Sequence, residues 1–126
     1  MNHTNIEIRF SDQDGHQHVH HEAMVAYIAH GRINFVDGIL NESGLIDTVD
    51  YILAKLSVEF LKPVTWPGKV KINVYPERIG TKSYILKYDI TKHGDDEPFC
   101  KAETVTVFYD IATGESIPVP DVFKLK

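Results

Sequence analysis

Cysteine is nearly absent from this sequence, since Cys100 is the only one among its 126 residues. A single cysteine excludes an intrachain disulfide and a zinc site built on several cysteine ligands. Also missing are a run of about 20 apolar residues, which a membrane span needs, and a basic and apolar signal pattern in the N-terminal stretch MNHTNIEIRF. These absences predict a cytoplasmic protein with no membrane partner.

Clustered positive charge is lacking as well, because 18 Asp and Glu residues outweigh 13 Lys and Arg residues and give a net charge of −5. Binding to nucleic-acid phosphates needs clustered Lys and Arg, so no nucleic-acid partner is predicted. A small anionic ligand needs only a few local cations and remains compatible with this balance. The length, with 43% hydrophobic residues, predicts one domain over residues 1–126 that buries its own core.

The order of polar and apolar residues predicts one helix and five strands. Residues 5–10 alternate as a half-buried strand does, and apolar residues recur every three or four positions from Glu22 to Leu40, as in a long helix. Four more long strands are predicted over residues 51–61, 69–79, 83–92 and 99–110. The expected fold class is α+β, with the helix packed on an antiparallel meander. Open sheet edges favour self-association through an edge or a face.

Two glycines, Gly31 and Gly38, lie inside the predicted helix, where each costs about 1 kcal/mol relative to alanine. A sheet laid closely across the helix would offset that cost. We therefore expect a close approach of another segment at these glycines.

The segment HQHVHH, residues 16–21, contains four histidines and follows two aspartates, Asp12 and Asp14. Its H-x-H-x-H-H pattern superficially resembles the H-x-H-x-D-H of metallo-β-lactamase-type hydrolases. Those proteins are much longer and need further ligands, whereas only His93 remains downstream here as an imidazole ligand. No metal is predicted, and most of these histidines are expected to lie in a solvated loop.

A different chemistry would use the Asp14 carboxylate together with the start of the helix. The first turn of a helix presents unpaired backbone N–H groups that can polarise a carbonyl oxygen. Asp14 lies seven residues before His21, at the predicted helix start, and could act there as a base or a nucleophile. Asp12, an aspartate just before a helix, is expected to be a turn former or cap.

The run IEIRFSDQDGHQHVHHEAMVAYIAHGR resembles the opening signature of hotdog-fold acyl-CoA thioesterases, the 4-hydroxybenzoyl-CoA thioesterase-like group. The likeness continues through VEFLKPVTWPGKVKINVYPERIGTKSYILKYDI and AETVTVFYDIATGESIPVP, and so covers nearly the whole chain. It implies a hotdog fold, in which a five-stranded antiparallel sheet wraps a long central helix. It also implies an acyl-CoA substrate, no cofactor, and a homodimer or homotetramer with the active site between two subunits.

The resemblance assigns catalysis to Asp14, as general base or nucleophile on the thioester, and to His21, through its side chain or its backbone N–H. The helix face and the matching motif positions supply the candidate substrate-binding residues, which are His18, Val19, His20, Met24, Tyr27, Ile28, Lys82 and Ser83. Cations for the CoA phosphates are expected among Lys62, Arg78 and Lys82.

Several positions depart from the family pattern, among them Met24 in place of an aromatic residue, Ala29 and His30 where a glutamate is common, and His20 and His21 in place of two asparagines. Gln17 replaces the usual glycine, which predicts a different loop backbone, and Phe10 lacks the hydroxyl of the tyrosine found in one branch. A non-catalytic hotdog module that binds an acyl thioester, a fatty acid or a protein is the main alternative. A hotdog hydratase is less favoured, because its H-F-P and D-x-N-P-x-H patterns are absent. Hydrolysis of an acyl-CoA thioester is the predicted function.

Overall fold

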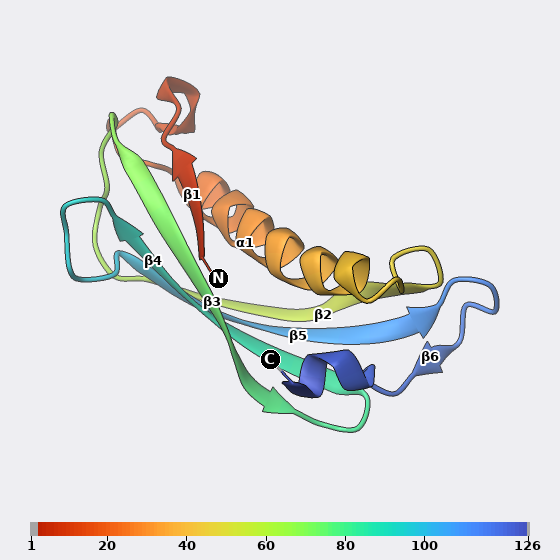
Figure 1. The fold of residues 1–126 in the computed structure, drawn as a ribbon. Coiled ribbons are helices and arrows are strands. Elements are labelled where there is room, and N and C mark those ends of the chain that lie inside the picture. The colour runs from red at the N-terminus through yellow and green to blue at the C-terminus, as the bar shows by residue number, and fades with distance from the viewer. Residues whose placement is uncertain (1–2, 126) are drawn as a thin grey trace.

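The computed structural model describes residues 3–125, which form one long helix against a curled antiparallel sheet (Figure 1). The elements are β1 His3–Glu7, η1 Phe10–Asp12, α1 His21–Glu42, β2 Val49–Phe60, β3 Lys69–Ile79, β4 Ser83–Lys92, β5 Cys100–Asp110, β6 Ser116–Ile117 and η2 Asp121–Leu125. None of the helices in this part of the chain has both the length and the apolar character needed to cross a bilayer.

The predicted helix and the four long strands are all present, and their bounds agree with the sequence pattern to within two residues. The first strand lies earlier than the predicted residues 5–10, since β1 runs from His3 to Glu7 and Phe10 already opens the 3-10 turn η1. That turn ends the extended conformation of the chain and starts the loop that carries both aspartates. The C-terminal end of α1 is followed by Gly44, which has a φ of 77° in the left-handed region that glycine tolerates.

The sheet order is β1-β3-β4-β5-β2, with the short β6 beside β5. The predicted meander is correct for β3, β4 and β5, and it is wrong for β2. This strand does not form a hairpin with β3 but crosses to the far edge, where Val49 pairs with Asp110 and Phe60 pairs with Cys100. Alternation of residues identifies a strand but not its partner, and the loop after β2 is too long to fix a hairpin.

The hydrophobic core lies between α1 and the concave face of the sheet (Figure 1). Alternate residues are buried from Val70 to Val74 in β3 and from Tyr84 to Ile90 in β4, as the alternation requires. The largest fully buried side chains include Ile28, Val36 and Leu40 of the helix and Ile72, Tyr84, Leu86, Tyr88 and Phe108 of the sheet.

The expectation of a close approach is confirmed at Gly31 and wrong at Gly38. A methyl group added at Gly31 would lie 2.6 Å from Ile72 Cγ2 and 3.1 Å from Val74 Cγ2, so β3 lies directly on the helix there. A methyl group added at Gly38 would have no atom within 4 Å among the residues described. Only Gly31 is therefore required by packing.

These two glycines give a matched pair of substitutions. Gly31→Ala is expected to destabilise the protein by about 1–3 kcal/mol, because β3 must shift to accept the methyl group. Gly38→Ala is expected to stabilise it by about 0.5–1 kcal/mol through helix propensity. Urea unfolding followed by circular dichroism measures both changes, and a stabilising Gly31→Ala would contradict this account of the packing.

Candidate active site

Asp12 fastens the loop between β1 and α1 to the body of the protein. Its side chain is only 2% exposed. The carboxylate accepts hydrogen bonds from the Arg9 backbone N–H at 2.9 Å, from the Arg9 guanidinium at 3.0 and 3.1 Å, and from the Tyr27 hydroxyl at 2.7 Å. The Asp12 carbonyl oxygen accepts from the backbone N–H of His20 at 2.9 Å. Asp12 therefore links the end of β1, the start of α1 and the second turn of α1.

Charge on Asp12 is favoured in spite of its burial. Burial alone would raise the pKa of this carboxyl group, but the hydrogen bonds from the Arg9 backbone and the Tyr27 hydroxyl outweigh that effect and lower its pKa. Burial and the bond to Asp12 raise the pKa of Tyr27, so the phenol stays protonated as the donor. The sequence indicates a turn former at Asp12 but contains no signal for the bond to Tyr27, which is 15 residues away.

Asp14 occupies the exposed tip of the same loop. Its Oδ1 accepts hydrogen bonds from the backbone N–H groups of His16 at 2.8 Å and His18 at 3.2 Å. These two bonds, first that of His18 and then that of His16, lower the pKa of Asp14, so its carboxylate is ionised at neutral pH. None of the residues described donates to Oδ2, which leaves that oxygen available for a substrate or a water molecule.

The backbone at Gln17 has a conformation that favours glycine, the residue that the resembled signature has at this position. Gln17 has a φ of 64°, inside the left-handed region that a side chain disfavours. Its N–H donates to the Asp14 carbonyl oxygen at 3.1 Å, and the Asp14 N–H donates to the His18 carbonyl oxygen at 2.8 Å. These bonds close a tight turn around Asp14, and they hold Gln17 in the less favourable conformation.

The start of α1 is capped by a histidine side chain. His20 is the N-cap residue, and its Nδ1 accepts from the backbone N–H of Ala23 at 3.0 Å. The backbone N–H groups of His21 and Glu22 come earlier in the helix and have no acceptor among the residues described. Free N–H groups and the positive end of the helix dipole make this end of α1 suited to a developing negative charge.

Asp14 and the helix start line one open groove, which we call the Asp14 groove, with a volume of about 450 Å³. Six of the residues predicted for the site line it together, namely Asp14, His18, Val19, His20, His21 and Met24. Lys62, predicted as a phosphate-binding cation, also lines the groove and forms an ion pair with Asp95. The local sequence pattern around Asp14 therefore predicts residues that the fold brings together.

The opposite wall of the groove was not predicted from the sequence. It consists of Phe60, Leu61 and Pro63, at the end of β2 and in the loop that follows. A hydrogen bond from the Val19 N–H to the Val64 carbonyl oxygen, 2.7 Å long, ties the two walls together. The crossing of β2 to the far edge of the sheet brings this wall to the helix start, and no sequence motif encodes that crossing.

Four predicted substrate-binding residues lie outside the groove of one chain. Tyr27 and Ile28 are buried in the core. Ser83, with Lys82 beside it, begins β4 and pairs with Val107. Phe60, which lines the groove, pairs with Cys100 of the same strand β5. Cys100 and Val107 are therefore separated by about 23 Å along β5, at 3.3 Å per residue. Lys82 and Ser83 therefore lie at the other end of the sheet from Asp14.

Within residues 3–125, no three side chains of His, Cys, Asp or Glu gather closely enough to hold a metal ion. His20 is used as the helix cap, and His21 packs edge-on against Phe60 with the ring centroids 6.4 Å apart.

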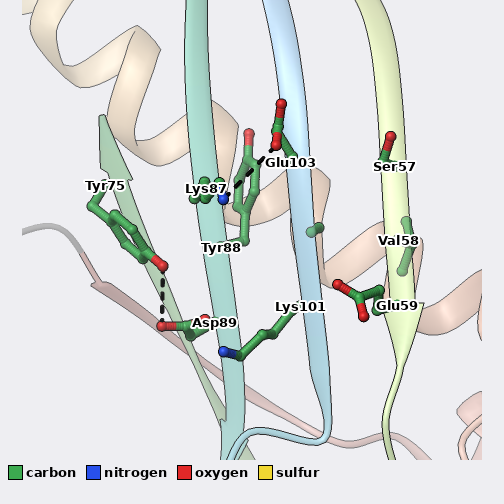
Figure 2. Close-up of a pocket in the computed structure, with 10 residues that line it drawn as sticks. Ser57, Val58, Glu59, Tyr75, Lys87, Tyr88, Asp89, Lys101 and Glu103 are labelled. Atoms are coloured by element: carbon green, nitrogen blue, oxygen red, sulfur yellow. Dashed lines mark hydrogen bonds and ion pairs between the residues drawn. The ribbon is translucent and has the colours of Figure 1, made fainter. Parts of the chain in front are cut away.

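A separate small hollow lies on the outer face of the sheet, with α1 behind the strands (Figure 2). Lys87 faces Glu103 with their charged atoms 4.0 Å apart, and the Tyr75 hydroxyl donates to Asp89 at 3.4 Å. Opposite charges stand across neighbouring strands, an arrangement typical of a solvated sheet face. None of the residues predicted for the site lies in this hollow.

The fold and the family follow from comparison with known proteins. A model of the thioesterase-like superfamily matches residues 8–126. The chain belongs to the thioesterase-like superfamily. Its long helix on a curled antiparallel sheet confirms the predicted hotdog fold. A protein from Pseudomonas aeruginosa shares this fold with a TM-score of 0.86. The two are 23% identical, over 98% of this chain and 95% of that one.

A curated relative and a protein of the same fold illustrate the activities named among similar proteins. A 1,4-dihydroxy-2-naphthoyl-CoA hydrolase from Picosynechococcus sp. is 28% identical over 81 residues, which are 64% of this chain and 52% of the relative. The chain thus matches about half the length of that curated relative. A 1,4-dihydroxy-2-naphthoyl-CoA thioesterase from Synechocystis has a TM-score of 0.79, at 14% identity over 97% of this chain and 91% of that one. At this level of identity, the second likeness concerns the fold.

The bond between Tyr27 and Asp12 leads to a prediction about stability. Tyr27→Phe is expected to cost about 1–3 kcal/mol of unfolding free energy at pH 7, because it removes a donor from a buried carboxylate. Since the folded-state pKa of Asp12 is lowered, its stabilisation is present above the ordinary value of 3.8 and is lost as the pH falls through the lower folded-state pKa. The difference between variant and wild type should therefore shrink below pH 3.8.

Tyr109→Phe is the matched control, since the Tyr109 hydroxyl donates to an exposed partner, Asp50, at 3.0 Å. It is expected to change stability by no more than about 0.5 kcal/mol. Urea unfolding of both variants at pH 7 and pH 2.5 measures these effects. Equal losses of unfolding free energy in the two variants would show that the buried bond to Asp12 contributes no more to stability than an exposed bond does.

Proposed function

We propose that this protein hydrolyses the thioester bond of an acyl-CoA and releases a carboxylic acid and CoA. The observation that carries this proposal is the Asp14 groove, where an ionised carboxylate and the free N–H groups of a helix start line the same space. The family and the hydrolase name of the Picosynechococcus relative support the same reaction. A carboxylate and a carbonyl-polarising group are the two elements that attack on a thioester requires.

In the proposed reaction the thioester carbonyl oxygen lies at the start of α1, within reach of the His21 N–H. Asp14 either removes a proton from a water molecule that attacks the carbonyl carbon, or attacks that carbon itself to form a mixed anhydride. In both routes the carbonyl oxygen gains negative charge, the carbon–sulfur bond breaks, and CoA leaves as a thiolate that takes up a proton. Water cleaves the anhydride in the second route and regenerates the Asp14 carboxylate.

The electrostatics of Asp14 favour the nucleophilic route. A general base works best when its pKa lies near the operating pH. The backbone N–H groups of His18 and His16 instead lower the pKa of Asp14 and hold its Oδ1 in place. The carboxylate is thus ionised at neutral pH and held by its Oδ1, and none of the described residues donates to Oδ2, which is proposed to attack. The helix start contributes about 3–4 kcal/mol for each N–H that binds the developing oxyanion.

We further propose that the active form is a homodimer joined along β2. Within the described residues, this 12-residue strand pairs only with β5, so its other edge is open. The exposed apolar side chains Ile52, Leu53 and Phe60 lie along it. A long open edge of this kind is a template for pairing with another chain. Since Phe60 lines the Asp14 groove, a second β2 on this edge would place the partner next to the proposed site.

The role of Asp14 is tested by thiol release from a panel of acyl-CoAs. Asp14→Asn is expected to lower kcat by at least about 100-fold, because an amide is neither a nucleophile nor a base. The Asn side-chain oxygen can still accept the bonds from His16 and His18, so the loop should keep its shape. A chelator should leave the turnover of the wild-type protein unchanged.

Asp47→Asn is the control, since Asp47 is exposed beyond the opposite end of α1. Its turnover should equal that of the wild type. If Asp14→Asn also kept wild-type turnover, Asp14 would not be catalytic. Loss of turnover on chelation would indicate a metal-dependent reaction, and ligand binding without turnover would indicate a binding module.

The role of β2 is tested by the substitution Leu53→Lys, which brings like charges together at the proposed interface. We expect the wild type to sediment as a dimer or a larger oligomer, and Leu53→Lys to sediment as a monomer with reduced turnover. Ile111→Lys is the control, because Ile111 is equally apolar and exposed but lies beyond the end of β5. A wild-type protein that is active as a monomer would refute the proposed dimer.

A further inference from the structure

A second hollow lies on the other side of Asp14 and has a volume of about 650 Å³. Besides Asp14, it is lined by Phe10, Ser11, Gln13, Gln17, Thr65 and Trp66. Asp14 is the one residue that lines both this hollow and the Asp14 groove. A thioester whose carbonyl lies beside Asp14 therefore has the groove on one side and the second hollow on the other.

The charges around the two spaces indicate which end of an acyl-CoA enters each. No Lys or Arg is among the residues that line the second hollow, so its lining offers no cation to a phosphate. The Asp14 groove has Lys62 on its wall. The phosphates of CoA therefore fit the side of the groove, and the uncharged acyl group fits the second hollow.

Two exposed aromatic side chains dominate the apolar surface of this hollow. Phe10 is 70% exposed and Trp66 is 43% exposed. Their ring centroids are 5.3 Å apart, and their planes are nearly perpendicular at 88°. An edge-to-face pair leaves the face of a ring open, so a third flat ring can stack on it or meet it edge-on.

Polar side chains surround this aromatic pair. Ser11, Gln13, Gln17 and Thr65 supply hydroxyl and amide groups to the same hollow. Such groups can hydrogen-bond to substituents on a ring, and they give a flexible alkyl chain nothing to bind. The volume of the hollow is within the range of about 300–1,000 Å³ typical of small-molecule sites.

We propose that Phe10 and Trp66 form the acyl-group subsite and select aromatic acyl groups over saturated ones. The proposal rests on the proposed thioester hydrolysis for its reaction, but the subsite is defined by the hollow and its two rings. In this arrangement Phe10 and Trp66 determine specificity, while Asp14 and the helix start perform the chemistry.

Two substrates of nearly equal size test the selection. Benzoyl-CoA carries a flat ring, and cyclohexanecarbonyl-CoA carries a puckered ring with the same number of carbon atoms. The wild-type kcat/KM is expected to be about 3- to 10-fold higher for benzoyl-CoA, the factor that one aromatic pair supplies. Phe10→Leu and Trp66→Leu should each bring the ratio of the two kcat/KM values toward one.

Tyr75→Leu is the control, since Tyr75 is a partly exposed aromatic residue on the outer face of the sheet, away from both spaces (Figure 2). Its ratio of kcat/KM values should equal that of the wild type. A wild-type ratio near one, or a ratio that Phe10→Leu and Trp66→Leu both leave unchanged, would overturn the subsite.

Trp66 is the only tryptophan in the chain, so its fluorescence reports directly on the hollow without any turnover. The two probes are the non-hydrolysable thioethers benzyl-CoA and cyclohexylmethyl-CoA. Benzyl-CoA is expected to shift the Trp66 emission and to bind several-fold more tightly than cyclohexylmethyl-CoA, a preference that Phe10→Leu removes. No change in emission at saturating benzyl-CoA would overturn the subsite. If this preference persists while no acyl-CoA is hydrolysed, the subsite stands and the proposed hydrolysis fails.

Discussion

The buried carboxylate of Asp12 is the interaction on which the candidate site depends. A carboxylate that is 2% exposed is stable only when its hydrogen-bonding capacity is filled, and Arg9 and Tyr27 fill it here. Because Arg9 follows β1 and Tyr27 belongs to α1, the bonds fix the path of the chain between the two elements. The loop tip that carries Asp14 and the helix start at His21 are both positioned by this one buried group.

Asp12 and Asp14 are two residues apart and have opposite environments. Asp12 is enclosed, and its oxygens are used to hold the structure together. Asp14 is exposed, and only one of its oxygens is bound by the loop. In an extended chain, two residues of equal parity face the same way. Here Asp12 ends the turn η1, while Asp14 belongs to the next turn, which is closed by its backbone bonds with Gln17 and His18. The division of roles is therefore a property of the loop.

The sequence was sufficient to predict the helix, the long strands and the residues near Asp14, because each depends on local pattern. Periodicity marks α1, and the tight loop keeps Asp14, His18 and His21 near one another along the chain. The place of β2 was not predictable in the same way, since its pairing with β5 joins residues far apart in the sequence. The groove wall at Phe60 depends on that pairing. Likewise, nothing local distinguishes Gly31, which contacts β3, from Gly38, which does not.

Asp14 and the walls of the spaces beside it come from segments that are far apart in the sequence, which has a consequence for the evolution of this protein. The groups proposed for bond cleavage lie in one short stretch from Asp12 to His21, closed by its own hydrogen bonds. Much of the surface around that stretch, at Phe60 and Trp66, comes from a distant segment formed by the end of β2 and the loop that follows it. This segment meets the stretch through the backbone bond between Val19 and Val64. A backbone bond does not depend on side-chain identity. Substitutions in that distant segment can therefore change the substrate preference while the groups proposed for bond cleavage keep their places.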